Sequence, residues 1–435
     1  MDVIGMILSE ANMRKAVDRV KRNRGAPGVD GMPVDELPGY FAEHGEEIKA
    51  SIRNGTYKPS PIRRVCIPKP NGEKRPLGIP TAIDRVVQQA VAQVLTHIFD
   101  DTFSEHSHGF RPGRSAHGAM AECLGYLEEG YAWVVDIDIR RFFDTVNHDR
   151  LISILRMRMN DARTLRLIRS FLRSGVMENG LATESEEGVP QGSPLSPILS
   201  NICLDRLGKE LEGRGLKFVR YADDCNMFVK SRRAAERVLA SVSAWLERRL
   251  CLRANEEKSM AVPANKSQFL GFRFWKRSNG WRLRVDEKRK QRLKDKVKEI
   301  TKRNKAVARP LAFTFIKLNQ TARGWINYFS IACMKTFMGE FGGWMRHKAR
   351  VAILKQWKKP RTIYRNLMAL NKRFGCGMGD NEIYKVANPR LGLYRSAGYD
   401  TVSYLLSPKV LAMPKEDRPG LVNPLEYYLG RFVNK

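Results

Sequence analysis

The sequence has few cysteines, and none of them is paired. No two of the seven form a C-x-x-C motif, and they stand singly at Cys66, Cys123, Cys203, Cys225, Cys251, Cys333 and Cys376. An odd number of isolated cysteines argues against a disulfide framework and against a structural zinc site. We therefore expect a reduced, cytoplasmic protein.

Long apolar runs and targeting segments are also missing. No stretch approaches the ~18–20 consecutive apolar residues of a membrane span. The N-terminus, Met1-Asp2-Val3-Ile4, lacks the basic region and long apolar run of a signal peptide. The sequence therefore predicts no membrane-spanning or secreted protein.

Acidic residues are scarce in the C-terminal part. The 435 residues include 77 Lys and Arg against 46 Asp and Glu, a net charge of +31. Residues 1–250 hold 37 basic and 33 acidic side chains, whereas residues 251–435 hold 40 and 13. The first part has an ordinary globular composition, and the second is typical of proteins that bind polyanions. Nucleic acid is the first candidate partner, and a membrane surface is the second.

Hydrophobic spacing predicts the main elements. Residues 2–22, 82–99, 147–160 and 233–250 show helical spacing. Strand patterns, with turns at residues 68–72, 222–224 and 278–280, occur at residues 62–67, 74–79, 133–138, 216–229 and 268–285. Residues 286–309 read as a strongly basic helix, and helical segments continue to about residue 370. No internal repeat is visible.

Three aspartates lie where they could hold metal ions. Asp138 ends an apolar strand, and Asp223 and Asp224 lie at the tip of a predicted hairpin. Adjacent carboxylates repel one another, so a tight turn that carries two of them favours a compensating cation. Asp-Asp also forms ordinary turns, and Asp136 shares a strand face with Asp138, so spacing alone does not choose between these two.

Seven motifs in order give the chain a close resemblance to reverse transcriptases. Most distinctive is Tyr-Ala-Asp-Asp on a hairpin, preceded by an aspartate-bearing strand that leads into Phe-Phe-Asp. The motifs are RPLGIP at 75–80, HGFRPGRS at 108–115, DIDIRRFFD at 136–144, GVPQGSPLSP at 188–197, RYADD at 220–224, NEEKS at 255–259 and FLGF at 269–272. Gly25–Gly31 and Gly324–Phe329 resemble the N-terminal motif and the maturase domain of group II intron reverse transcriptases, most closely the compact bacterial group IIC type.

The resemblance implies a fold and a catalytic set. The fold is α+β, a right hand of fingers and palm followed by a helical thumb/maturase domain and a basic C-terminal region. The implied cofactor is Mg²⁺, as two ions. The implied metal set is Asp138, Ile139, Asp223 and Asp224, of which the three aspartates are catalytic.

Further residues are assigned to the nucleotide by the same resemblance. Phe143, five residues after Asp138, is expected to lie beneath the sugar and to reject ribonucleotides, although a lone phenylalanine is more often a core residue. Strand alternation in Phe142-Phe143-Asp144 would point only one ring to the site. The implied nucleotide contacts are Arg63, Lys69, Arg85, Phe143, Asp144 and Gln191. The alternatives are a solvated basic face for the cations and an ordinary loop residue for Gln191.

The basic C-terminal part is expected to bind nucleic acid. Trp325, Tyr328 and Phe329 share one helix face, which favours a packed core over a stacking platform. Lys258 is expected to support the primer side. The nucleic-acid contacts are predicted to include Lys258, Lys288, Arg292, Arg346, Lys358 and Lys359, with Lys348, Arg350, Lys355 and Arg361 as further candidates.

These observations predict an RNA-directed DNA polymerase that is also the maturase of its group II intron RNA and supports splicing and retrohoming. The expected partners are the intron RNA, an RNA template with a DNA primer, a DNA target and deoxynucleotide triphosphates. The alternatives are a maturase without polymerisation and a reverse transcriptase recruited to defence or repair. The missing C-x-x-C pairs also predict that no HNH endonuclease is present. We expect four parts: an extension (1–35), fingers and palm (36–285), thumb/maturase (286–370) and a DNA-binding region (371–435).

Overall fold

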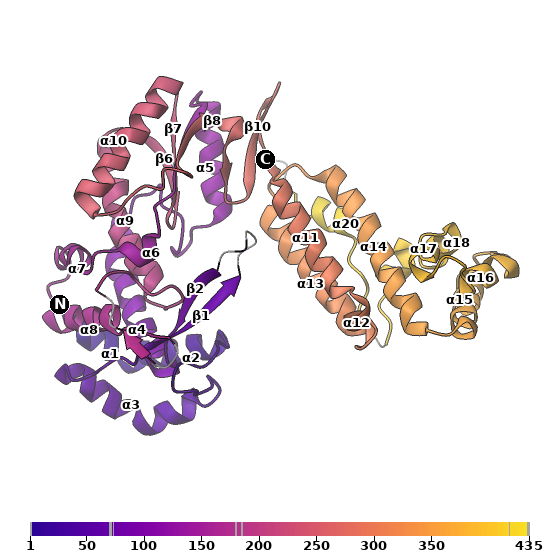
Figure 1. Ribbon diagram of the computed structural model, residues 1–435, viewed down its shortest axis with the longest axis horizontal. Helices are drawn as coiled ribbons and strands as arrows, with labels where there is room; N and C mark the ends of the chain where they lie inside the picture. The colour runs from indigo at the N-terminus through magenta and orange to yellow at the C-terminus, as the bar shows by residue number, and fades with distance from the viewer. Residues whose placement is uncertain are drawn as a thin grey trace. The chain divides into compact units, whose positions relative to one another are not determined.

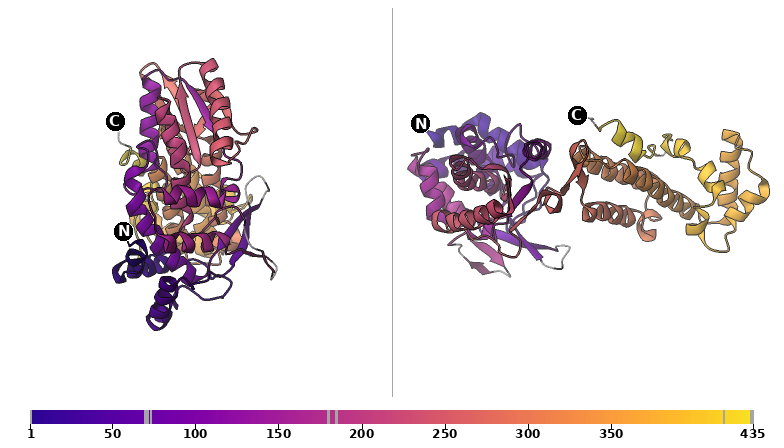
Figure 2. Two further views of the ribbon diagram at one scale, coloured as in Figure 1. Left: turned by 90° about the vertical axis from the view of Figure 1, so that its left-hand side faces the viewer. Right: turned by 90° about the horizontal axis from the view of Figure 1, so that it is seen from above.

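The chain folds into two compact units, residues 1–267 and residues 268–435. The computed structural model describes residues 2–68, 72, 74–178, 181–183, 186–416 and 418–432. Figure 1 labels most of the helices and strands of both units, and Figure 2 shows each unit from two further sides. Within the described residues, no helix is long and apolar enough to cross a membrane.

A four-stranded sheet lies at the centre of the first unit, with strand order β6-β7-β3-β8. Its strands are β3 (Trp133–Ile137), β6 (Lys217–Tyr221), β7 (Asp224–Val229) and β8 (Met260–Pro263). β3 is antiparallel to both of its neighbours, and Ile137 pairs with Cys225 of β7. This register places Asp138 beside the start of β7, so the two predicted groups of carboxylates meet at one end of the sheet.

Three helices pack against this sheet. α10 (Arg232–Leu250) contacts β3, β7 and β8, while α5 (Ala116–Glu128) and α9 (Ser196–Gly213) contact β6. α10 begins at Ser231, whose hydroxyl accepts a hydrogen bond from the Ala234 N–H at 3.3 Å, as expected of an N-cap serine. The predicted helix 233–250 is therefore confirmed.

A second four-stranded sheet of the first unit has the order β2-β1-β4-β5. β1 (Ile62–Pro68) and β2 (Lys74–Ile79) form the predicted antiparallel pair, with Arg63 opposite Ile79. β1 also pairs in parallel with β4 (Val176–Glu178), which β5 (Leu181–Thr183) extends. Residues 69–71 of the predicted turn, including Lys69, lie outside the described residues.

Helix α4 (Ala82–Phe99) follows β2 in the chain and packs against α9 and the N-terminal helices of the first unit. Thr81 caps it by accepting a hydrogen bond from the Asp84 N–H at 3.1 Å, and most of its residues are buried. α1 (Val3–Leu8) and α2 (Glu10–Arg22) pack against it, and α3 (Leu37–Asn54) contacts α2. The single helix predicted at 2–22 is thus divided, because Ser9 takes an extended conformation.

The remaining helices of the first unit are short. The predicted helix 147–160 ends earlier than expected, at Arg156. The α-helices are α6 (Phe142–Thr145), α7 (His148–Arg156) and α8 (Ala162–Arg173). Strand alternation does not apply to Phe142 and Phe143, because both lie in α6 and not in a strand.

The second unit opens with a three-stranded sheet of order β11-β10-β9. Its strands are β9 (Gln268–Phe269), β10 (Phe272–Arg277) and β11 (Gly280–Val285). The basic helix α11 (Glu287–Ile300) follows and is capped by Asp286, which accepts the Lys288 N–H at 2.9 Å and the Arg273 Nε–H at 2.7 Å. The hairpin thus belongs to the second unit, whereas the sequence-based boundary at 285/286 groups it with the palm.

Helices make up the rest of the second unit. α13 (Leu311–Phe329) packs on α11, and α14 (Lys335–Trp357) packs on α20 (Pro424–Leu429). The others are α12 (Arg303–Ala306), α15 (Pro360–Phe374), α16 (Asp380–Ala387), α17 (Leu393–Ser396), α18 (Asp400–Leu405) and α19 (Pro408–Ala412).

The predicted aromatic face of α13 is packed. Phe329 is buried, and its ring centroid lies 4.6 Å from that of Trp325 and 5.0 Å from that of Phe272. Tyr328 lies at the margin of this cluster, where its hydroxyl donates to the Leu270 carbonyl at 3.0 Å. The core interpretation is therefore confirmed for Trp325 and Phe329, and Tyr328 remains partly exposed.

Candidate active site

The predicted carboxylate turn joins β6 to β7. Tyr221 pairs with Asp224 across it, so Ala222 and Asp223 form the tip of a tight hairpin. Ala222 takes the left-handed conformation (φ +59°), which costs a residue with a side chain about 1 kcal/mol. Asp223 is half-buried, and Asp224 is exposed at the first position of β7. The turn thus presents two adjacent carboxylates at one end of the sheet.

Asp138 is held at the end of β3 by the loop that precedes β8. Its N–H donates to the Ser259 hydroxyl at 3.2 Å, and its carbonyl accepts the Asn255 N–H at 2.7 Å. The Asn255 side-chain amide donates to the carboxylate at 3.1 Å, and the Lys258 ammonium lies 3.7 Å from the same oxygen. Lys258, expected near the primer, thus pairs with Asp138.

The carboxylates of this region repel one another. Burial, followed by repulsion from Asp223 and Asp138, raises the pKa of Asp224 to about 6. Burial, followed by repulsion from Asp224 and Asp138, raises the pKa of Asp136 to about 7. The Asp224 side chain is nonetheless exposed to solvent. A bound cation would offset the repulsion from Asp223 and Asp138 and would so lower the pKa of Asp224. Asp136 lies within β3, two residues deeper in the sheet than Asp138.

The donor chemistry of these residues suits a hard divalent cation. Asp138, Asp223 and Asp224 offer carboxylate oxygens, the ligands that such ions prefer. Ile139 is buried and could contribute only its main-chain carbonyl. Within the described part of the chain, however, no group of three or more His, Cys, Asp and Glu side chains is drawn together closely enough to hold a metal ion.

A buried hydrogen-bond network holds the carboxylate turn in place. The Arg220 side chain is 1% exposed, and its guanidinium donates to the Ala222 carbonyl and to the Asn201 side-chain oxygen, both at 3.0 Å. The Asn201 amide in turn donates to the Gly109 carbonyl at 2.8 Å. A side chain added at Gly109 would place its Cβ 2.2 Å from the Ala222 nitrogen. The segment around Gly109 therefore lies directly against the backbone of the carboxylate turn.

A cavity of ~540 Å³ opens beside the turn. Its lining includes Arg85, Phe110, Phe143, Gln191 and Asp223, and it extends to Arg19, Asn23 and Gly25 of the N-terminal segment. Arg85 is 8% exposed, and its Nε and Nη2 atoms have no hydrogen-bond partner within the described residues. Burial lowers the pKa of this guanidinium, and the nearby Asp30 partly opposes the shift. Because these two nitrogens are buried without a partner among the described residues, they favour an anionic ligand in the cavity.

The N-terminal motif packs against the same region. The Arg63 guanidinium donates to the Pro27 carbonyl at 2.6 Å. A Cβ atom at Gly28 would lie 2.6 Å from the Thr81 Cα, and one at Gly25 would lie 2.3 Å from Arg85 Nη1. These glycines allow the loop to approach the start of α4 closely.

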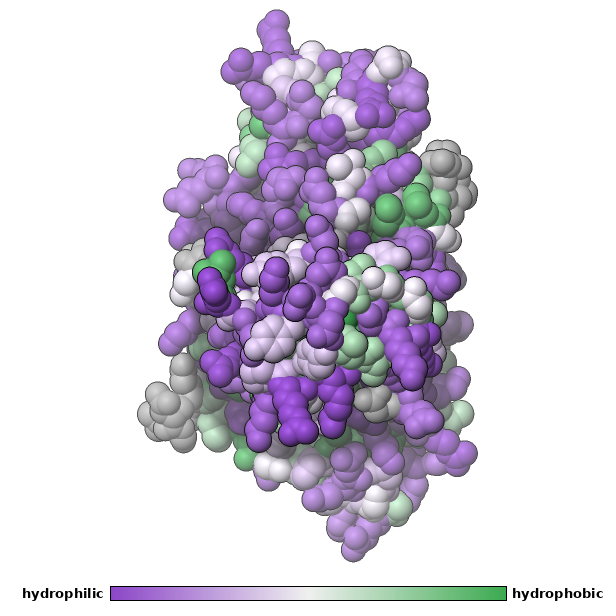
Figure 3. Space-filling view, turned by 90° about the vertical axis from the view of Figure 1, so that its right-hand side faces the viewer, coloured by the Kyte–Doolittle hydropathy of each residue, from purple (hydrophilic) through white to green (hydrophobic). Residues whose placement is uncertain are grey.

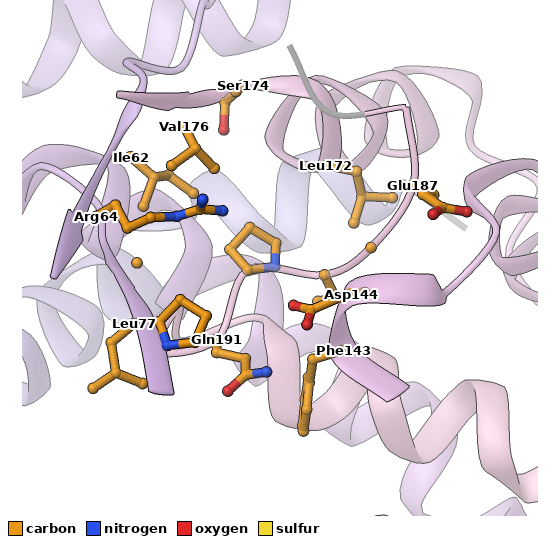
Figure 4. Close-up of a pocket in the computed structure, with 16 residues that line it drawn as sticks. Ile62, Arg64, Leu77, Phe143, Asp144, Leu172, Ser174, Val176, Glu187 and Gln191 are labelled. Carbon is orange, nitrogen blue, oxygen red and sulfur yellow. The ribbon is translucent and has the colours of Figure 1, made fainter. Parts of the chain in front are cut away.

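A second, smaller cavity of ~180 Å³ adjoins the sheet that contains β1 and β2. Figure 4 shows Phe143 and Asp144 reaching it from α6, Arg64 from β1, and Gln191 from the loop before α9. Phe142 is buried and packs edge-on against Phe143, with ring centroids 5.1 Å apart, whereas Phe143 lines both cavities. Phe142 is therefore a core residue, whereas Phe143 borders open space, as expected. The two rings differ because of their positions in the helix α6 and not because of strand alternation.

The predicted nucleic-acid contacts of the second unit are largely accessible. Residues 268–435 hold 37 Lys and Arg against 11 Asp and Glu. Lys288, Arg292, Lys358 and Lys359 are exposed, and Arg346 is half-buried. The face of the molecule seen in Figure 3 is mainly hydrophilic, with small apolar spots.

One further candidate of the second unit is corrected. Arg350 is 8% exposed, and its guanidinium donates to the Leu406 carbonyl at 3.0 Å and to the Ser403 hydroxyl and carbonyl at 3.0 and 3.2 Å. These bonds join α14 to α18. Arg350 is therefore a structural residue and not an RNA contact.

Three residues at the site were not singled out by the sequence reasoning. Phe110, Asn201 and Arg220 lie on three separate elements, and only the fold brings them to the carboxylate turn. Phe110 and Arg220 occur within quoted motifs, but neither carries a charge pattern or periodicity that reveals its role.

Comparison with known proteins places this site in a family. The reverse transcriptase (RNA-dependent DNA polymerase) family model matches residues 67–274, and the group II intron maturase-specific domain matches residues 290–370. Protein YkfC of Escherichia coli (strain K12) is 34% identical over 299 residues, which cover 60% of this chain and 78% of YkfC. The group II intron-encoded protein LtrA of Lactococcus lactis subsp. cremoris is 38% identical over 206 residues, 47% of this chain and 34% of LtrA.

Among solved structures, the similarity is weaker. A chain of the partial Cas6-RT-Cas1–Cas2 complex matches 57% of this chain and 43% of its own length, at 24% identity and a TM-score of 0.36, which adds nothing to the argument. With a reverse transcriptase domain followed by a maturase-specific domain, the chain belongs to the group II intron-encoded reverse transcriptase and maturase family.

Proposed function

We propose that the protein copies RNA into DNA and serves as the maturase of a group II intron RNA, supporting its splicing and retrohoming. The observation that carries the polymerase part is the position of Asp138 and the Asp223–Asp224 turn at one end of the sheet, beside a cavity lined by the buried Arg85, whose Nε and Nη2 have no hydrogen-bond partner within the described residues. The substrates of this reaction would be an RNA template, a DNA primer and deoxynucleotide triphosphates, and retrohoming adds a DNA target.

The metal set in this proposal consists of Asp138, Asp223 and Asp224, with the Ile139 carbonyl as a further ligand. Two bound Mg²⁺ ions would activate the primer 3′-hydroxyl and support the departing pyrophosphate. Asn255 orients the Asp138 carboxylate through its 3.1 Å hydrogen bond, and Lys258 offsets part of its charge. Arg220 fixes the carbonyl of Ala222 and so keeps the turn in one conformation.

The nucleotide is proposed to lie in the larger cavity. Arg85, whose Nε and Nη2 have no partner within the described residues, supplies positive charge for the triphosphate, and Arg63 supports the loop next to it. Phe143 bounds the space below the sugar, with Asp144 next to it, and Gln191 lies on the template side. Lys69, outside the described residues, is proposed as a further triphosphate contact.

The second unit is proposed to bind the intron RNA and the DNA target. Exposed cations without a matching number of acids attract a polyanion through counterion release. On α11 these are Lys288 and Arg292, and at the α14–α15 junction they are Lys358 and Lys359, with Arg346 nearby. The finer division into four parts, with a DNA-binding region at 371–435, is also a proposal.

Primer extension on an RNA template with Mg²⁺ tests the polymerase part. The Asp223→Ala variant is expected to lose synthesis by on the order of 10³-fold or more, because a metal ligand is removed. Its thermal unfolding should match that of the wild type. The control is Asp101→Ala, which removes an exposed acid away from the turn. Wild-type synthesis by Asp223→Ala would refute the site.

Intron RNA splicing separates the two roles. We expect Asp223→Ala to retain splicing of the intron RNA encoded beside the protein, because the second unit is unchanged. Failure of the wild type to extend any primer would favour a maturase without polymerisation. A flanking genome without a group II intron RNA would instead favour recruitment to another task.

A further inference from the structure

Phe110 has an unusual backbone conformation. Its φ is +58°, in the left-handed region that bulky residues avoid, and its side chain is 55% exposed. An exposed aromatic ring gains little from burial to compensate for this strain. The conformation must therefore be imposed by neighbouring residues.

Both neighbours of Phe110 are firmly anchored. Gly109 lies against the Ala222 nitrogen, and its carbonyl accepts the Asn201 amide at 2.8 Å. Arg111 is 9% exposed, and its guanidinium donates to Asp100 Oδ1 at 2.9 Å, the Ser104 carbonyl at 2.7 Å and the Ser107 carbonyl at 3.1 Å. A strained residue between two such anchors is over-determined by its surroundings, a state that occurs preferentially at functional sites.

Phe110 is one of the residues that line the larger cavity. Phe110 shares the lining with Asp223, Phe143 and Gln191, and with the Arg85 guanidinium, whose Nε and Nη2 have no partner within the described residues. The cavity volume of ~540 Å³ falls within the range of small-ligand sites. The cavity therefore combines a buried positive charge, a carboxylate of the proposed metal set and two aromatic side chains.

We propose that Phe110 contacts the substrate: its ring packs against a nucleoside unit of the base pair formed at the active site. This inference rests on the proposed polymerase function. Flat aromatic rings stack on bases and pack on sugars regardless of sequence, which is the recognition a polymerase needs. The nucleoside unit is that of the incoming nucleotide or of the template nucleotide opposite, two sources of the same chemistry.

A merely structural role makes a different prediction. If Phe110 served the fold, its removal would lower thermal stability together with activity. In our proposal the ring is strained and exposed, so Phe110→Gly relieves the left-handed conformation and leaves stability equal or higher. Activity should nevertheless fall, because the contact is lost. Opposite changes in stability and activity thus identify a residue retained for function.

The matched control is Cys251→Gly. Cys251 is also exposed and left-handed, with φ +56°, and it ends α10 away from the cavity. The same glycine substitution should relieve the same kind of strain there and leave the kinetics unchanged. Phe110→Tyr and Phe110→Trp keep an aromatic ring and should restore most of the activity.

The experiment measures single-nucleotide incorporation on an RNA template with a DNA primer, together with anisotropy binding of that duplex and thermal unfolding. We expect Phe110→Gly to lower kcat/KM by roughly ten- to hundredfold, the worth of one stacking contact. A higher KM for the nucleotide with unchanged duplex affinity identifies the incoming nucleotide. Weaker duplex binding identifies the template.

Two results overturn the proposal. One is kinetics and duplex affinity of Phe110→Gly within twofold of the wild type. The other is a loss of activity that follows a lowered melting temperature. Should the wild type itself extend no primer, the polymerase function fails, and binding still decides: equal affinities of the wild type and Phe110→Gly for both the duplex and the incoming deoxynucleotide overturn the contact.

Discussion

Arg111 in the first unit and Arg292 in the second are the same residue type in opposite surroundings. Arg111 is buried and bonds to Asp100, Ser104 and Ser107, whereas Arg292 projects from α11 into solvent. The first unit, which is nearly neutral, uses buried polar groups to fix the backbone around its carboxylates. The second, with a net charge of +26, keeps most of its cations at the surface. Charge positions atoms in one unit and attracts a polyanion in the other.

Replacing each arginine by methionine tests this contrast most strongly. Arg111→Met should cost about 3–5 kcal/mol of stability, because the Asp100 carboxylate and three main-chain carbonyls lose their donor inside the protein. Arg292→Met should change stability by less than about 0.5 kcal/mol. Calorimetry measures the stability of both variants, and equal losses of stability would contradict the contrast between the two units.

Gly109→Ala tests whether packing on the carboxylate turn controls catalysis. The added Cβ would lie 2.2 Å from the Ala222 nitrogen, so the turn must shift. A displacement near 1 Å can cost on the order of 10²-fold in rate. The control is Gly125→Ala in α5, where no atom lies within 4 Å and stability should rise by about 0.5–1 kcal/mol. Steady-state primer extension gives the rates, and an unchanged kcat for Gly109→Ala would contradict the prediction.

Phe143→Ala examines how the first unit discriminates between sugars. The ring lines both cavities beside Gln191, and its removal opens space for a 2′-hydroxyl. Ribonucleotide incorporation relative to deoxynucleotide incorporation should rise by on the order of 10- to 100-fold. If competition assays show the selectivity of the wild type, Phe143 is a packing residue like Phe142.

Removing two surface cations sharpens the other side of the comparison. The double variant Lys288→Gln and Arg292→Gln should bind RNA less tightly and with a weaker dependence on salt. Each lost phosphate contact lowers the slope of log affinity against log salt by ~0.7–0.9. Lys15→Gln, an exposed lysine of α2, serves as the control. Polymerisation at saturating template should persist, and an unaltered salt slope would exclude α11 from the interface.

The smallest effect concerns a polar cluster next to β6. The Glu122 carboxylate contacts His106, accepts the Tyr126 hydroxyl at 2.6 Å and lies 2.6 Å from the His108 ring nitrogen. Hydrogen bonding to Glu122 raises the pKa of His106, and the negative charge of Glu212 adds to this rise. Burial of the ring and the positive charge of Lys217 act in the opposite direction. Although burial opposes it, bonding to His106, His108 and Tyr126 lowers the pKa of Glu122 to about 2.

The sign of the pH dependence follows from these two shifts. The contribution of His106 is present below its unfolded pKa of ~6.5 and is lost as pH rises through its higher folded value. That of Glu122 is present above ~4.5 and is lost as pH falls toward 2. Glu122→Gln should therefore destabilise the first unit by about 1 kcal/mol more at pH 5.5 than at pH 9. Melting temperatures across this range check it, and a pH-independent difference would contradict it.

Much of the fold could be predicted from local pattern. The strands β1, β2, β3, β6 and β7 and the helices α4 and α10 follow from alternation, helical spacing and turn residues close to one another in the sequence. The break at Ser9 and the short helix α6 could not, because they depend on the backbone conformations of single residues. The parallel pairing of β1 with β4 joins positions far apart in the sequence.

Some residues of the candidate site could likewise be predicted from the sequence, and others could not. Asp138, Asp223 and Asp224 could be predicted because motifs mark them, and the sheet register places them at the same end of the sheet. The supporting network of Arg220, Asn201 and Gly109 could not be predicted, since its hydrogen bonds link three elements and leave no periodic signal. Arg350 was misassigned because a charged residue on a basic helix shows no sign in the sequence of being buried.

Pairing along β6 has a consequence for solubility. β6 is the outermost strand of its sheet, and Ser107 forms a parallel bridge with Arg220 of this strand. Two main-chain hydrogen bonds of 2.8 Å support the bridge: the His108 N–H donates to the Arg220 carbonyl, and the Arg220 N–H donates to the His106 carbonyl. An uncovered outer strand recruits strands of other molecules and promotes aggregation. The segment 106–108 therefore shields the strand that leads into the carboxylate turn, and loosening it should cause self-association as well as loss of activity.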